Sequence, residues 1–182
     1  MNLPNKLTIL RTIMIFPFVF FLLTDAAGTN GKYIACALFI IASFTDFLDG
    51  YIARKHDLVT NFGKFMDPLA DKLLVSAALI CLTATQSLPA WIVIIIISRE
   101  FIISGFRLIA SDNGIVIAAS YWGKFKTFSQ MVMIVLLILS IDHPVMSLLE
   151  TIFIYLSLIL TVISLIDYLA KNFHVLKEGS NK

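Results

Sequence analysis

The sequence predicts an all-α integral membrane protein with six transmembrane helices and a short interfacial segment at its N-terminus. Hydrophobic residues make up 59% of the 182 residues and charged residues only 14%, whereas about a quarter of a soluble domain is charged. The mean hydropathy is +0.91. The apolar residues also gather into six long stretches, each near the ~20 residues that a helix needs to cross a bilayer. The length fits a single domain over residues 1–182.

The predicted spans follow one another with short polar breaks. They cover residues 7–24, 32–54, 63–85, 89–110, 121–141 and 145–170. Each must be a helix, because backbone polar groups in hydrocarbon need partners within the same segment. Residues 2–8 are more polar and predict a short interfacial helix that leads into the first span. The polar tail from Lys171 is expected to fray.

The first span resembles a signal peptide only in its positive flank. Asp25-Ala-Ala-Gly is a poor cleavage site, so we expect the helix to be retained. With a cytoplasmic N-terminus, Lys32 alone of the 14 Lys and Arg residues lies outside. The positive-inside rule therefore predicts that both termini are cytoplasmic. A bacterial inner or plasma membrane is the expected compartment.

Four aspartates stand between two strongly apolar segments and are predicted to face the cytoplasm. Asp46 and Asp49 fall on one face of the second span, and Asp67 and Asp71, four residues apart, share a face of the third. If these faces meet, four carboxylates converge on one small volume, which requires cations. Because no Cys or His is near, hard ions are expected, namely two Mg²⁺ or Mn²⁺ ions, with Ca²⁺ less suited. Two such ions would form a phosphoryl-transfer site.

Small residues accompany the aspartates. Gly50 and Ala53 lie on the face of Asp46, and Gly63 lies one turn before Asp67. Their missing side chains would let a bulky ligand approach the helix backbone. The alternative is that they let the two helices pack closely.

This stretch resembles the signature of a known family. The pattern D-x2-D-G-x2-A-R-x8-G-x3-D-x3-D, from Asp46 to Asp71, matches that of the CDP-alcohol phosphatidyltransferases at every fixed position. The resemblance implies six transmembrane helices, a homodimer and a cavity open to the cytoplasm. It also implies transfer of a phosphatidyl group from CDP-diacylglycerol to an alcohol, with release of CMP.

The same resemblance implies roles for single residues. Asp46, Asp49 and Asp67 would bind the metals, and Asp71 would be the general base and could also contact a metal. The CDP pocket would be lined by Gly50, Ala53, Arg54 and Gly63. The segments Asn2-Leu-Pro-Asn5, Ser98-Arg-Glu100 and Gly123-Lys-Phe-Lys126-Thr127 resemble members of the family whose acceptor is sn-glycerol 3-phosphate.

An acceptor that carries a phosphate needs cations near the acids. Arg107, Lys124 and Lys126 are the candidates, since they lie toward the cytoplasmic ends of the fourth and fifth spans. Snorkelling of these side chains to lipid headgroups is the alternative. Arg11 could join them or bind anionic lipid.

The remaining polar residues are expected to be structural. Arg99 and Glu100 lie deeper, where a charge is costly, so they predict an ion-pair network with Lys72 or another acid. Two further predictions are that Asp167 pairs with Lys171, four residues on, and that Asn5 and Thr8 help to bind the nucleotide. The cysteines, Cys36 and Cys81, fall inside apolar spans and predict buried packing residues with neither a disulfide nor a zinc site.

Two other functions remain open. An ion or proton transporter could use intramembrane aspartates, although these acids gather at one membrane edge and no pair of broken inverted-repeat helices is visible. The same chemistry could also use inositol phosphate, serine or phosphatidylglycerol as acceptor. A net charge of +2 is too small to predict nucleic-acid binding.

Overall fold

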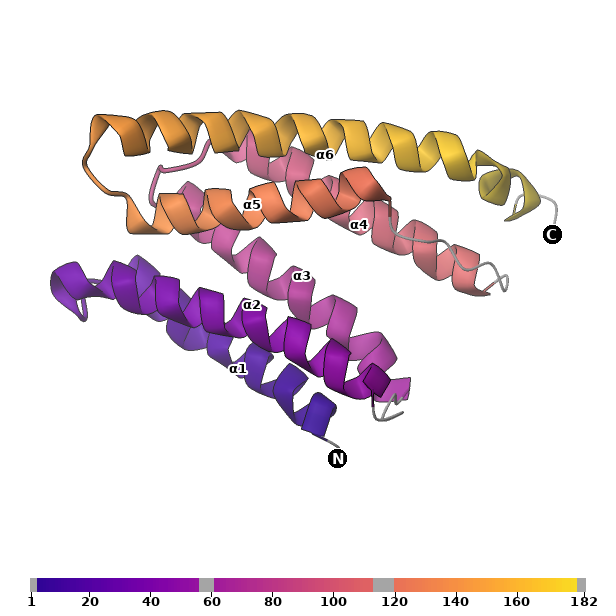
Figure 1. The fold of residues 1–182 in the computed structure, drawn as a ribbon, viewed down its shortest axis with the longest axis horizontal. Helices are drawn as coiled ribbons and strands as arrows, with labels where there is room; N and C mark the ends of the chain where they lie inside the picture. Colours follow the sequence, from indigo (N-terminus) through magenta and orange to yellow (C-terminus); the bar gives the residue numbers. More distant parts are fainter. Residues whose placement is uncertain (1–2, 56–60, 113–119, 180–182) are drawn as a thin grey trace. The chain divides into compact units, whose positions relative to one another are not determined.

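The computed structural model describes residues 3–55, 61–112 and 120–179, without the side chains of residues 3–4, 46–55, 61–65, 67–68, 109, 111–112 and 173–179. The described residues form six α-helices and one short 3-10 helix, and no strand (Figure 1). These elements are α1 (Leu3–Leu23), η1 (Gly28–Asn30), α2 (Gly31–Lys55), α3 (Asn61–Ala84), α4 (Ala90–Asp112), α5 (Tyr121–Leu139) and α6 (Pro144–Gly179). The predicted all-α class is confirmed.

Among the described residues, three helices are long and apolar enough to cross a membrane. The qualifying segments are Asn5–Leu23, Tyr121–Leu139 and Pro144–Asn172. The helices α2, α3 and α4 are of similar length, with 25, 24 and 23 residues, but each contains several charged residues. Six transmembrane helices therefore stay a prediction.

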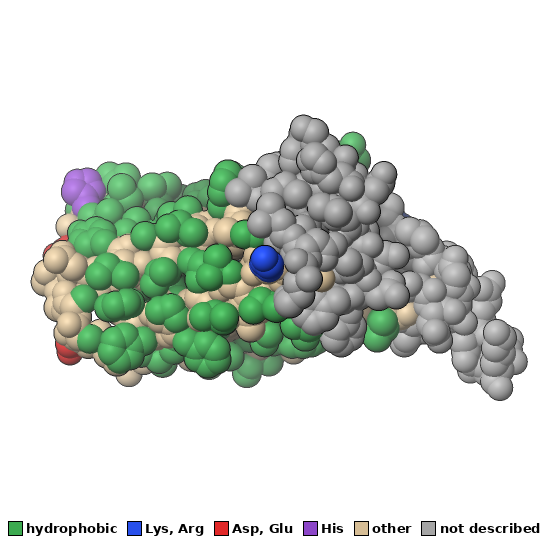
Figure 2. All heavy atoms as spheres, turned by 90° about the horizontal axis from the view of Figure 1, so that it is seen from below, with side chains coloured by type: hydrophobic (Ala, Val, Ile, Leu, Met, Phe, Trp, Pro, Cys, Tyr) green, Lys and Arg blue, Asp and Glu red, His purple; other side chains and the backbone are tan. Residues whose placement is uncertain are grey.

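The described surface suits a hydrocarbon environment. Large apolar side chains are exposed on all six helices, and Phe16, Leu108 and Ile166 are among the most exposed. On the face drawn in Figure 2, apolar side chains cover most of the described surface. In water such a surface would be an aggregation or interaction site, so its extent indicates a membrane protein.

Two boundaries differ from the sequence prediction. The helix α1 begins at Leu3, so residues 3–8 of the segment predicted as a separate interfacial helix form its first turns. At the other end, α6 continues to Gly179 through the tail that was expected to fray. The backbone leaves helical geometry at Asn172 (φ −117°, ψ 17°), whose side chain donates a 2.8 Å hydrogen bond to the carbonyl of Tyr168. Leu176, Lys177 and Glu178 then favour helix beyond this break.

The chain divides into two compact units. The first consists of residues Met1–Pro89 with Leu137–Ser140, and the second of Ala90–Leu136 with Ile141–Lys182. Each unit has its own packing and is described by itself. The prediction of a single domain over the whole chain stays a prediction.

In the first unit, α1 packs against both α2 and α3. The rings of Phe18 and Phe39 lie 5.8 Å apart between α1 and α2. Where α1 and α2 approach at their hairpin, a Cβ on Gly31 would lie only 3.0 Å from the carbonyl oxygen of Phe21. This contact is why glycine is needed there. Both cysteines, Cys36 and Cys81, are buried, as predicted for packing residues.

In the second unit, α4 packs against α6. Ile103, Phe106 and Ala110 of α4 form a buried cluster with Tyr168 of α6, and the two rings meet edge to face at 5.6 Å.

The buried face of α6 also carries hydroxyl groups, which the sequence analysis missed. Ser157, Thr161 and Ser164 are fully buried, and the Ser157 hydroxyl donates to Ser129 of α5 at 3.3 Å. Small hydroxyl residues let helices approach closely in a membrane and bond across the contact.

Candidate active site

The predicted metal ligands lie at matched levels on α2 and α3. Residues 56–60 join the two helices, and a connection of this length spans at most about 20 Å. At a rise of about 1.5 Å per residue, Asp46 and Asp49 lie about 14 and 9 Å before the end of α2, and Asp67 and Asp71 lie about 9 and 15 Å after the start of α3. The two helices also contact each other. The four aspartates are therefore carried at similar depths on adjoining helix ends.

Of the four aspartate side chains, the structure describes that of Asp71. Asp71 is half-buried, next to Ala70 and one turn before Leu74, both of which are buried in the core of the first unit. Its side chain has an interaction partner. The remaining predicted residues of the acidic and CDP sites lie outside the described side chains: Asp46, Asp49, Gly50, Ala53, Arg54, Gly63 and Asp67.

The first turns of α1 bring buried polar residues to the same depth. Asn5, Thr8 and Arg11 are all buried, and each has an interaction partner. Measured from the hairpin that joins the two helices, Thr8 and Asp46 each lie about 22 Å along their helix, and Asn5 and Asp49 each lie about 27 Å along theirs. Because α1 contacts α2 and α3, its N-terminal end belongs to the acidic region. The sequence signal for this was the presence of polar residues at the start of an otherwise apolar helix.

The donor chemistry of this region fits a hard divalent cation. Four carboxylates offer oxygen ligands, which Mg²⁺ and Mn²⁺ prefer. No group of three potential ligands is found among the described side chains, and three of the four aspartates lie outside them. The fit therefore rests on the donor set and on the matched helix levels.

The three cations predicted for the acceptor phosphate all lie in the second unit, and they divide into two kinds. Arg107 and Lys124 are exposed, and their charged groups lie over the rings of Tyr168 and Tyr121 at 5.8 and 5.4 Å. Lys126 is buried instead, and its ammonium group is paired with Glu100. The first two are available to a ligand at the surface of the unit, whereas Lys126 is already engaged.

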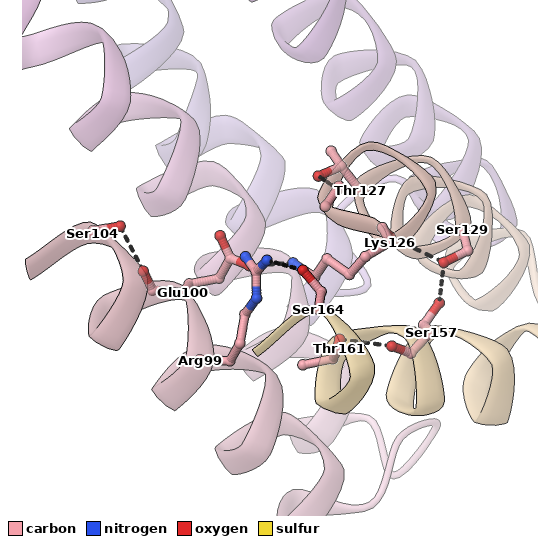
Figure 3. Close-up of polar contacts among 10 residues, drawn as sticks. Arg99, Glu100, Ser104, Lys126, Thr127, Ser129, Ser157, Thr161 and Ser164 are labelled. Carbon is pink, nitrogen blue, oxygen red and sulfur yellow. Dashed lines mark hydrogen bonds and ion pairs between the residues drawn. The ribbon is translucent and has the colours of Figure 1, made fainter. Parts of the chain in front are cut away.

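Glu100 is the centre of a buried ion-pair cluster, which we call the Glu100 cluster: Arg99 and Glu100 of α4, Lys126 of α5 and Ser164 of α6. These side chains turn toward one another in Figure 3. Arg99 donates to Glu100 at 2.9 Å and to the Ser164 hydroxyl at 2.5 Å. The predicted ion-pair network of Arg99 and Glu100 is thus present, and within the second unit its further partner is Lys126.

The start of α5 is fixed beside α6. The Ser120 hydroxyl donates a 2.8 Å hydrogen bond to Asp167, which also pairs with Lys171 at 2.6 Å. The predicted pair of Asp167 and Lys171 is confirmed. The next residue, Tyr168, carries Arg107 on its ring. One turn of α6 therefore positions both the start of α5 and the Arg107 side chain.

These features define an α-helical membrane protein with an acidic region at the adjoining ends of consecutive helices. A family model described as CDP-alcohol phosphatidyltransferase matches residues 1–163. The chain belongs to this family, and the resemblance noted from Asp46 to Asp71 is confirmed.

Curated relatives resemble the chain over most of its length. The CDP-diacylglycerol–glycerol-3-phosphate 3-phosphatidyltransferase of Bacillus subtilis is 44% identical, with 98% of this chain and 99% of the relative covered. The protein of the same name from Haemophilus influenzae is 41% identical, with 92% and 91% covered. A probable phosphatidylglycerophosphate synthase of Mycobacterium tuberculosis is 38% identical, with 93% and 81% covered.

Proposed function

We propose that this protein transfers the phosphatidyl group of CDP-diacylglycerol to sn-glycerol 3-phosphate, giving phosphatidylglycerophosphate and CMP. The observation that carries this proposal is the complete family signature, whose four aspartates are at matched levels on α2 and α3. The names of the relatives support glycerol 3-phosphate as the acceptor.

Asp46, Asp49, Asp67 and Asp71 would hold two divalent ions. When bound, Mg²⁺ or Mn²⁺ would neutralise the pyrophosphate of the donor and the charge of the departing CMP. Gly50, Ala53, Arg54 and Gly63 would bind the CDP moiety.

Asp71 would act as the general base. Its carboxylate removes the proton from the terminal hydroxyl of the acceptor. The hydroxyl oxygen then forms a bond to the phosphorus of the phosphatidyl group, while the bond from that phosphorus to the oxygen of CMP breaks. The proton remains on Asp71 and the electron pair leaves with CMP, so the step needs no further reactant.

Arg107 and Lys124 are the cations proposed to bind the acceptor phosphate. Arg107 and Lys124 are exposed, and a guanidinium group suits bidentate contact with phosphate. Lys126 was predicted to share this role, and that stays a prediction because its ammonium group contacts Glu100.

The proposed setting is a bacterial inner or plasma membrane, with six spans, cytoplasmic termini, a cytoplasmic active site and a homodimer. The bacterial relatives and the three spanning helices support the membrane location. A cytoplasmic site would receive soluble glycerol 3-phosphate directly.

One assay tests the activity. Purified protein in detergent receives CDP-diacylglycerol, Mg²⁺ or Mn²⁺, and either glycerol 3-phosphate, serine, inositol phosphate or phosphatidylglycerol, and CMP release is measured. We expect release with glycerol 3-phosphate, its loss on chelation by EDTA, and its recovery when Mg²⁺ is added back. CMP release with another acceptor, but not with glycerol 3-phosphate, would mean that the protein uses that other acceptor. If no acceptor gives CMP release, the proposed phosphatidyltransferase activity is refuted, and the alternative of an aspartate-based transporter is favoured.

A further inference from the structure

A cavity of about 520 Å³ lies at the hairpin that joins α1 to α2. Its volume is in the range of cavities that bind small molecules. The whole cavity belongs to the first unit. The side chains that matter for a ligand come from the last turn of α1, the connecting turn and the first turn of α2: Phe21, Leu22, Asp25, Lys32 and Tyr33.

The cavity lies at the level of lipid headgroups. The apolar segment Asn5–Leu23 is long enough to cross the hydrocarbon core of a bilayer. With α1 across the membrane, the hairpin that follows Leu23 comes at the edge of this core, at the end of α1 away from the N-terminus (Figure 1). Asp46 lies about 22 Å further along α2. The cavity is therefore separate from the acidic region.

Two opposite charges line the cavity. Asp25 is exposed, and its carboxylate has no hydrogen-bond or ion-pair partner among the residues that the structure describes. The Lys32 ammonium donates a 3.3 Å hydrogen bond to the carbonyl of Ser140, in the same unit, and lies 5.4 Å from the centre of the Tyr33 ring. An ammonium group has three donors, and Ser140 uses one of them. A ligand in this cavity therefore meets both an acceptor and a positioned donor.

This pattern of charge fits a zwitterion that carries a phosphate and a primary ammonium group. The phosphate would accept a hydrogen bond from Lys32, and the ammonium would donate to Asp25, and both bonds would be charge-assisted. The half-buried apolar side chains of Phe21 and Leu22 line the same cavity, which suits a ligand with attached acyl chains. Tyr33 is an exposed aromatic residue of the kind enriched at membrane interfaces.

We propose that this cavity binds the headgroup of a phosphatidylethanolamine molecule from the surrounding membrane. Lys32 holds the phosphate of the lipid and Asp25 holds its ammonium group. The site takes no part in the proposed reaction, so the inference is independent of the proposed function.

The test compares lipids that differ only in the headgroup. Native mass spectrometry of the full-length protein, without CDP-diacylglycerol, measures binding of phosphatidylethanolamine, phosphatidylcholine and phosphatidylglycerol with identical acyl chains. The intact protein should prefer phosphatidylethanolamine to phosphatidylcholine by about two- to fivefold, the value of an exposed charge pair, because choline has no N–H donor. Asp25→Ala should remove this preference. Lys32→Met should weaken all three lipids by a similar factor, because all of them carry the phosphate.

Two control variants complete the test. Lys6→Met removes an exposed cation at the other end of α1, and it should bind the three lipids as the intact protein does. Lys32→Arg keeps the charge and the donors, so it should retain binding even if Lys32→Met disturbs the contact with Ser140.

The inference is wrong if the intact protein binds the ethanolamine and choline lipids equally, or if Asp25→Ala keeps the preference. It is also wrong if Lys6→Met weakens binding as much as Lys32→Met, since the lipids would then respond to net charge alone. Displacement of the lipid by an equal concentration of soluble phosphoethanolamine would overturn the membrane ligand in favour of a soluble one. Because these experiments measure binding and not CMP release, their failure would leave the proposed function standing.

Discussion

The acidic region of the first unit and the Glu100 cluster of the second contrast in how they are encoded. Asp46 to Asp71 form one continuous stretch on two consecutive helices, at fixed helical spacing. The Glu100 cluster instead joins residues from α4, α5 and α6 that are as much as 65 positions apart in the chain. Local spacing can reveal the first kind of site, whereas only the fold can reveal the second.

The two regions also differ in charge. Four carboxylates would gather in the acidic region, and such a group needs cations to be stable. The Glu100 cluster has its own counterions, two cations for one carboxylate. The contrast predicts that variants in the first region mainly affect turnover and that variants in the second mainly affect stability. The following substitutions test this division.

The largest effect is expected for Asp71→Asn. If the carboxylate is the general base, CMP release should fall by about 10²- to 10⁴-fold, while thermal unfolding in detergent stays close to that of the intact protein. Asp142→Asn is the matched control, because Asp142 is exposed between α5 and α6, and it should keep full activity. Near-normal turnover in Asp71→Asn would remove Asp71 as the base, and recovery at high Mn²⁺ would make it a metal ligand instead.

Lys126→Met should mainly reduce stability. It removes a charged hydrogen bond from Glu100, which keeps Arg99 as a partner, so we expect a loss of about 1.5–3 kcal/mol in the free energy of unfolding. Lys124→Met on the same helix removes an exposed cation and should change stability by no more than about 0.5 kcal/mol. Unfolding by SDS in mixed micelles measures both. Equal stability of the two variants would contradict the structural role of Lys126.

Sequence reasoning predicted the helices well because each is a long apolar run between polar breaks. It failed at the ends of the chain. Residues 3–8 and 172–179 belong to polar stretches of the sequence, yet they are part of α1 and α6. Polarity reports whether a segment suits hydrocarbon, not whether it remains helical, so composition alone could not place these ends.

The candidate site was predicted unevenly. The four aspartates were found from their spacing, but their geometry depends on how α2 and α3 meet. Lys126 was grouped with Arg107 and Lys124 from its position in the chain, although its neighbour in space is Glu100. The hydroxyls of Ser157, Thr161 and Ser164 did leave a signal, since they recur every three or four residues along an apolar helix and so mark one face.

A smaller effect is expected where α1 and α2 approach at their hairpin. Gly31→Ala would place a Cβ 3.0 Å from the Phe21 carbonyl oxygen, and the backbone would have to shift at a cost of about 1–2 kcal/mol. Gly105→Ala in α4 is the control, because the added Cβ meets no described heavy atom within 4 Å beyond the neighbouring backbone of its own helix, and alanine should stabilise that helix by up to about 1 kcal/mol. Unfolding of the two variants should therefore shift in opposite directions. If Gly31→Ala leaves the free energy of unfolding unchanged, α1 and α2 approach each other less closely than described.

The smallest effect tests the hydroxyl face of α6. Ser157→Ala removes the buried hydrogen bond to Ser129, and such bonds between membrane helices average about 0.6 kcal/mol. Ser147→Ala changes an exposed hydroxyl on the same helix and should leave the free energy of unfolding unchanged. Both variants should keep full CMP release, because neither hydroxyl is among the proposed catalytic or binding groups. A loss of stability in Ser157→Ala as large as that in Lys126→Met would mean that the hydroxyl face and the Glu100 cluster act as one network, joined by the hydrogen bond from Ser129 to the Lys126 carbonyl.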